Sequence, residues 1–179
     1  MSNLVMDRFS EVTARCVGFM IDTLNKASEA NFGDGSDGST TFVKNAQALQ
    51  LGKVVIAVGI FSIFEARLQD SLNCSDGFAE LRKILSSASR QDLALRFEQF
   101  AAAVNVLKHG KGRSYDWLLS YEALPFIVKA RDQHFFFEGD VSEPDTLVLV
   151  DDAFVRSCAE LVQASIEAVR GVKPDIYFG

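Results

Sequence analysis

The chain has 179 residues, a length that corresponds to one domain with a substantial hydrophobic core. Hydrophobic residues make up 48% of it and charged residues 23%, so a wholly disordered chain is excluded. The formal net charge of −6 argues against a general polyanion-binding protein, whose surface is basic overall. The longest apolar run, residues 54–64, is too short for a membrane span of about 20 residues, so we expect a core segment and no membrane partner.

Cysteine usage and the N-terminus bear on the compartment. Cys16, Cys74 and Cys158 have no metal-ligand spacing, and so few cysteines favour a reducing environment over a disulfide scaffold. The first residues contain no apolar segment typical of a secretory signal. We therefore expect a cytoplasmic protein that holds no metal and no cofactor.

The first half of the chain is predicted to be helical, since no proline occurs before Pro125. Helical spacing predicts a first helix with one buried face, formed by Val5, Phe9, Val12, Cys16, Phe19, Thr23 and Ala27. Residues 33–40, GDGSDGST, form a flexible loop by composition. A second helix is expected over residues 42–73, bent or broken near Gly52 or Gly59, and its apolar run predicts the central, most buried helix.

The second half combines helices with a short hairpin. A third helix is expected over 78–85, and a capping box at residues 89–92 predicts the start of a fourth, which ends at His109-Gly110. Residues 115–121 form a helical turn, and apolar segments at 134–138 and 147–150 predict a β-hairpin at about 134–150. Asp151 or Asp152 caps a last helix. The sequence thus predicts a single domain over 1–179, an all-α up-and-down bundle of about five helices with a β-hairpin insertion before the last helix.

Charge is distributed unevenly along this acidic chain. Residues 104–131 contain five basic side chains (Lys108, Lys111, Arg113, Lys129 and Arg131) against two acidic ones, whereas residues 132–179 are strongly acidic. A local contact with phosphate is one interpretation, carried by Lys108, Lys111 and Arg113. The other is that Lys108 and His109 complement the negative end of the helix dipole while the remaining charges are solvated.

Asn105 and His109 are the pair of residues that could carry chemistry. They are four apart, so they share one face of the fourth helix, and this face points away from the stripe through Phe97, Phe100 and Val104. Histidine exchanges protons near neutral pH, and an asparagine amide orients it or a phosphate oxygen. The loop after His109 matches no P-loop, and the sequence contains no nucleophile elbow, HExxH motif or EF-hand loop.

An apolar helix that ends in IFSIFEARL (60–68) and a later helix that ends in NVLKHG (105–110), within an all-α bundle, resemble a HEPN domain. The resemblance implies a homodimer with an RNA- or nucleotide-related role in a toxin–antitoxin or phage-defence setting. It also implies metal-independent ribonuclease activity, with Asn105 and His109 as catalytic residues in a site shared by two subunits. The family's motif has an arginine four to six residues before the histidine, and Val104 stands in its place here. A non-catalytic, dimeric protein-interaction module with a decayed active site is therefore the alternative function.

Further candidates lie beside this pair. Glu65, at the end of the apolar run, is either a functional carboxylate or an ordinary residue at the edge of the core. Tyr115 and Trp117 either stack on a nucleic-acid base or anchor the basic loop on the bundle. Phe135, Phe136 and Phe137 are too apolar for a free hairpin, so one or two of them are expected to face outward, toward a partner subunit.

Overall fold

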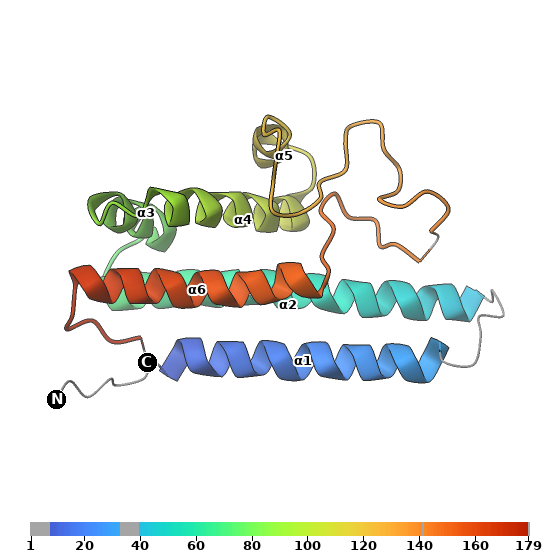
Figure 1. The fold of residues 1–179 in the computed structure, drawn as a ribbon, viewed down its shortest axis with the longest axis horizontal. Helices are drawn as coiled ribbons and strands as arrows, with labels where there is room; N and C mark the ends of the chain where they lie inside the picture. The colour runs from blue at the N-terminus through green and yellow to red at the C-terminus, as the bar shows by residue number, and fades with distance from the viewer. Residues whose placement is uncertain (1–7, 33–39, 141, 179) are drawn as a thin grey trace.

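A computed structural model describes residues 8–32, 40–140 and 142–178. Six helices pack together in these ranges: α1 (Arg8–Phe32), α2 (Thr40–Leu72), α3 (Gly77–Ser87), α4 (Gln91–His109), α5 (Arg113–Leu118) and α6 (Asp152–Val172). The long helices α1, α2, α4 and α6 lie side by side with alternating chain direction, and α3 joins α2 to α4 (Figure 1). The fold is all-α, with one more helix than predicted. Val5 and the predicted loop at 33–39 lie outside the described residues, and Thr40 already belongs to α2.

The helix at the centre of the bundle is α6. It contacts α1, α2, α3 and α4, and ten of its 21 residues are buried. The prediction that α2 is the most buried helix is wrong, because α2 packs with one side only and leaves Leu51, Val55 and Ile63 exposed. The helix continues through Gly52 and Gly59 without a break. By length and hydropathy α2 could cross a membrane, but 33% of its most apolar 18-residue stretch is buried within the fold.

Helix α1 buries a face that mostly differs from the one predicted. Of the predicted residues Phe9 packs against the core, but the buried residues are Val17 and Ile21, with Leu24 packed beside them. Val12, Cys16 and Phe19, which the spacing placed in the core, are exposed. The helix carries apolar residues over much of its circumference, and periodicity alone does not indicate which part of such a surface meets the other helices.

The junction between α3 and α4 does not contain the predicted capping box. Ser89 has a φ of 55° and closes the end of α3, where its N–H donates to the Ser86 carbonyl and the next N–H, from Arg90, donates to the Leu85 carbonyl. This pair of bonds is the Schellman arrangement for ending a helix. Helix α4 therefore begins one residue later, with Arg90 as its N-cap and no side-chain capping bond.

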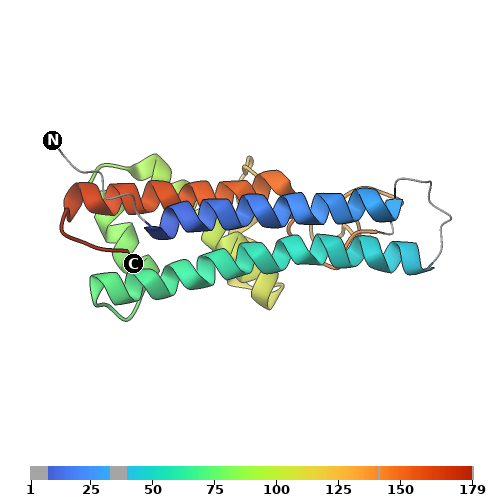
Figure 2. The same ribbon diagram turned by 90° about the horizontal axis from the view of Figure 1, so that it is seen from below.

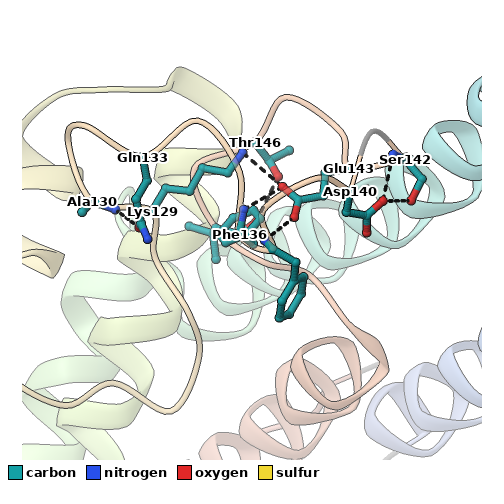
Figure 3. Close-up of polar contacts among 10 residues, drawn as sticks. Lys129, Ala130, Gln133, Phe136, Asp140, Ser142, Glu143 and Thr146 are labelled. Atoms are coloured by element: carbon teal, nitrogen blue, oxygen red, sulfur yellow. Dashed lines mark hydrogen bonds and ion pairs between the residues drawn. The ribbon is translucent and has the colours of Figure 1, made fainter.

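The predicted hairpin at 134–150 is absent, and the described residues form no strand. Val128 and Val148 form an isolated antiparallel bridge, so 147–150 pairs with a segment upstream of 134–138. The backbone N–H groups of Phe136 and Phe137 donate instead to the Glu143 carboxylate, at 2.7 and 2.6 Å (Figure 3). A carboxylate thus satisfies donors that a partner strand would otherwise satisfy.

A buried ion pair holds this irregular segment, residues 119–151. Lys129 Nζ lies 3.7 Å from Glu143 Oε2, and the two side chains are only 4% and 6% exposed (Figure 3). The ammonium also lies 4.4 Å from the centre of the Phe136 ring. Such a pair orders the chain around it, because each charge needs the other once both have left water.

Helix α6 begins where the sequence predicts. The Asp151 side chain accepts from Phe154 N–H at 2.8 Å and so caps the helix. The next residue, Asp152, receives a hydrogen bond from Asn25 of α1 and forms a 2.8 Å ion pair with Lys53 of α2. Burial alone would raise the pKa of Asp152, but these two partners outweigh it and hold that pKa below its usual value. This carboxylate therefore links three helices.

Candidate functional site

Asn105 and His109 lie on the outer side of α4. Both side chains are exposed, while Phe97, Phe100 and Val104 on the opposite side are buried. Helix α4 ends at His109 because Gly110 follows with a φ of 74°, a conformation that glycine adopts without strain. Asn105 and His109 thus stand one turn apart at the C-terminal end of the helix.

Two adjoining hollows meet at Asn105. The larger, of about 510 Å³, is open, and it is lined by Arg82, Glu98, Ala101, Ala102, Asn105, Arg113, Ser114 and Trp117. The smaller, of about 200 Å³, lies between α2 and α4 and is lined by Phe61, Ser62, Glu65, Asp76, Phe78, Arg82, Ala101, Val104, Asn105 and Lys108. Neither lining includes His109 or Lys111. The structure therefore brings Asn105, Lys108 and Arg113 to one region and leaves His109 and Lys111 at its margin.

Arg82 is the residue of this region that sequence reasoning missed. It comes from α3, lines both hollows beside Asn105, and lies 3.9 Å from Glu98 in a half-exposed pair. A pair with this exposure contributes little, so the guanidinium is available to a ligand. The family motif has its arginine just before the histidine on the same helix, whereas Arg82 belongs to another helix. Only the packing of α3 against α4 brings Arg82 close, and no pattern in the sequence indicated it.

The basic segment at 104–131 supplies fewer free charges than its composition suggested. Lys129 is buried against Glu143, and Arg131 forms an exposed 2.6 Å pair with Asp116. Lys108, Lys111 and Arg113 are exposed and form no ion pair among the described residues. The acidic side chains Glu65, Asp76 and Glu98 line the same hollows, so a ligand here meets both signs of charge.

Tyr115 anchors the loop and does not face a ligand. It is fully buried, its Oη–H donates to the Lys129 carbonyl at 2.7 Å, and burial raises its pKa. The base-stacking role considered for Tyr115 is therefore wrong. Trp117 is half-buried, lines the larger hollow, and packs edge-on against Tyr121 with the ring centres 4.9 Å apart. One aromatic ring thus remains beside the two arginines.

Glu65 lies at the edge of the core, half-buried, on the wall of the smaller hollow. In the described parts of the chain, no group of three or more histidine, cysteine or acidic side chains is placed to hold a metal ion. The donors that meet near Asn105 are two guanidiniums, an ammonium and an indole, and three carboxylates line the same hollows. This set can hold a phosphate by charge-assisted hydrogen bonds and can contact a base through the ring.

No protein-family model, curated protein or solved structure matches the chain. The comparisons therefore identify no family, and the HEPN-like relationship stays a prediction.

Proposed function

We propose that this all-helical protein is HEPN-like and binds single-stranded RNA through the surface around Asn105. The observation that supports this proposal is that Arg82 and Arg113, from two other helices, line the same hollow as Asn105 and Trp117. Guanidiniums recognise phosphate oxygens in a bidentate manner, and an indole stacks on an unpaired base. The larger hollow also has the volume usual for a ligand site.

Each residue has a distinct role in this proposal. Arg82 and Arg113 bind the phosphate, Lys108 adds a nearby positive charge, and the Asn105 amide donates to a phosphate or sugar oxygen. Arg82 takes the place of the arginine that the family motif has before its histidine, since Val104 is buried and cannot reach the ligand. His109 and Lys111 contact the part of the RNA that extends beyond the hollow. Any proton transfer by His109 would therefore involve a nucleotide outside the hollow.

The binding proposal is tested by fluorescence polarisation with a labelled single-stranded RNA over a series of salt concentrations. Arg82→Gln and Arg113→Ala are each expected to weaken binding about tenfold or more, since a hydrogen bond to a charged group contributes about 1.5–3 kcal/mol. Each should also reduce the slope of log K against log salt by about 0.7, the value for one lost phosphate contact on a single strand. Asn105→Ala should weaken binding and leave that slope unchanged, because it removes no charge.

Lys83→Ala is the matched control. It removes one positive charge from α3, next to Arg82, but Lys83 does not line the hollow at Asn105. Equal losses of RNA affinity in Arg82→Gln and Lys83→Ala would show that only the overall positive charge of α3 contributes to binding. Absence of RNA binding by the wild type at low salt would overturn the proposal.

Catalysis is tested separately, by incubating structured and unstructured RNAs with the protein in EDTA. If the protein is a metal-independent ribonuclease, His109→Ala abolishes cleavage while binding in the polarisation assay is retained. Binding without cleavage by the wild type would leave an RNA-binding protein that lacks this activity.

The second candidate function is the non-catalytic, dimeric interaction module. The exposed apolar surface of α1 and α2 favours it, because such a surface typically marks a contact with another protein. The two functions are compatible, since the larger hollow at Asn105 has no residue of α1 or α2 in its lining, although Ser62 of α2 borders the smaller one.

A further inference from the structure

Helices α1 and α2 together present a large apolar surface. Val12, Phe19 and Met20 of α1 are exposed, as are Leu51, Val55 and Ile63 of α2; Phe19 is 74% exposed and Val55 is 63% exposed. The two helices pack on each other along their length (Figure 2), and the Phe9 ring of α1 lies 6.4 Å from that of Phe64 in α2. Val12 and Cys16 follow Phe9 by three and seven residues on the same side of the helix, so the exposed stripe of α1 adjoins α2, where Arg67 lies 5.9 Å from the centre of the Phe9 ring. Isolated exposed apolar residues are normal, but a continuous patch indicates a contact surface.

The exposed side of α2 follows a coiled-coil repeat. Its members are separated by four, three, four, three and four residues: Ala48, Gly52, Val55, Gly59, Ser62 and Ala66. All six are exposed or half-exposed, and Leu51 and Ile63 stand beside the stripe. This spacing keeps one face of a helix against a second helix over several turns. Because the stripe contains no charged residue and five of its members are small, another helix can approach it closely.

The stripe is also self-complementary when it is reversed. A two-fold axis at the level of Ala57, whose own side chain is buried within the subunit, pairs residues whose numbers add to 114. The resulting pairs are Ala48 with Ala66, Leu51 with Ile63, Gly52 with Ser62 and Val55 with Gly59. Leu51 and Ile63, beside the stripe, contact each other's copies, and within the stripe the Val55 side chain lies against Gly59. In a two-fold interface each pair of residues occurs twice, because residue i of one subunit contacts residue j of the other and residue j contacts residue i. The stripe meets this requirement, since its residues pair with one another when the helix is reversed.

Charge complementarity supports the same register. Lys44 and Asp70, at the two ends of the stripe, are exposed and form no ion pair within the described residues. Their numbers also add to 114, so the antiparallel arrangement places Lys44 of each copy beside Asp70 of the other. A parallel pairing would place Lys44 beside Lys44.

We propose that a second copy of this chain packs on this surface, with the two α2 helices antiparallel about Ala57 and each α1 facing its counterpart. The stripe runs over the 19 residues 48–66, or about 27 Å at 1.5 Å per residue, and two adjoining helices give a width of about 20 Å. The footprint is about 500 Å² per copy, so the total reaches the roughly 1,000 Å² expected of a specific interface. This inference rests on α1 and α2 and does not depend on RNA binding.

Gly59 allows the interface to be disrupted without disturbing the subunit. A Cβ atom at Gly59 meets no other atom within 4 Å, and the same is true at Gly18, on another side of α1. Gly59→Arg and Gly18→Arg therefore make the same change in open space, one inside the proposed interface and one outside it. In light scattering over a dilution series, wild type and Gly18→Arg are expected to have twice the monomer mass and Gly59→Arg the monomer mass, with equal helicity for all three by circular dichroism.

The register is tested by charge reversal. Lys44→Glu and Asp70→Lys are each expected to weaken their own homodimer, since each places like charges together at both ends of the seam. Mixing the two variants should restore dimers, because every pair in the mixed dimer then joins opposite charges. In a parallel interface the wild type would already have like charges at both ends, so neither variant alone would be weaker than the wild type, and the mixture would be stronger than it.

Three results would overturn the proposal. The first is a wild-type protein that stays monomeric at all concentrations, and the second is a Gly59→Arg variant that stays dimeric. The third is wild-type protein that binds phosphatidylcholine vesicles through α2, with binding lost in Gly59→Arg. That result would assign the apolar surface to a membrane.

Discussion

The buried Lys129–Glu143 pair makes a quantitative prediction about stability. Replacing Glu143 by Gln leaves the Lys129 ammonium without its counter-charge at a site where the two side chains are only 4% and 6% exposed. It also weakens the acceptor for the N–H groups of Phe136 and Phe137, which lie 2.7 and 2.6 Å from the carboxylate. Removing one partner of a buried pair costs about 3–5 kcal/mol. We expect about 3 kcal/mol, because the Gln amide oxygen still accepts one of the two bonds.

The assay is urea denaturation followed by the fluorescence of Trp117, the single tryptophan, together with hydrogen exchange at Phe136 and Phe137. Glu80→Gln is the matched control, since Glu80 pairs with Lys83 at 3.1 Å with that lysine 74% exposed, and its loss should cost less than about 1 kcal/mol. The double variant Lys129→Met/Glu143→Gln should recover most of the loss, because it removes the unpaired buried charge. A loss below about 1 kcal/mol in Glu143→Gln, equal to that of the control, would refute the reasoning.

Three further predictions concern stability and reactivity. Gly77→Ala should lower the free energy of unfolding by about 1–3 kcal/mol, because the new Cβ would lie 2.7 Å from Leu68 Cβ. Gly18→Ala, where the new Cβ meets no other atom within 4 Å, should raise the free energy of unfolding by up to about 1 kcal/mol. Urea denaturation measures both changes. The lowered pKa of Asp152 adds stability that is fully present above its unfolded value of 3.8 and is lost as the pH falls through the lower folded value. Acid unfolding of Asp152→Asn should lack this component, whereas unchanged acid sensitivity would contradict the assignment. In the folded Gly59→Arg variant, which is expected to be monomeric, a thiol reagent should modify the exposed Cys16 quickly and Cys158 only after unfolding, because burial raises the Cys158 pKa. Mass spectrometry of the labelled peptides measures this.

Helix positions could be predicted from the sequence more reliably than helix faces. The end of α4 at His109-Gly110 and the cap of α6 at Asp151 depend on neighbouring residues, so local patterns were sufficient. The buried face of α1 depends on which helices it meets, and there the pattern pointed to the wrong side. The hairpin prediction was wrong for the same reason. The Glu143 carboxylate accepts hydrogen bonds from N–H groups that the local alternation had assigned to a strand.

The candidate site was predictable only in part. The spacing of Asn105 and His109 on one helix placed both on the exposed side, as the structure has them. Arg82 could not be predicted from the sequence, because only the packing of α3 against α4 places it beside Asn105. Lys129 was counted in the basic segment from its charge alone, and its burial beside Glu143 makes that charge unavailable to solvent or to a ligand.

The central position of α6 has a consequence for synthesis. This helix is the last of the six to leave the ribosome, yet it contacts α1, α2, α3 and α4. Until it emerges, the earlier helices keep open the apolar surfaces that it later covers. Contacts between such distant parts of the chain form slowly, and exposed apolar surface favours aggregation. The nascent protein is therefore expected to depend on chaperones until its final helix is released.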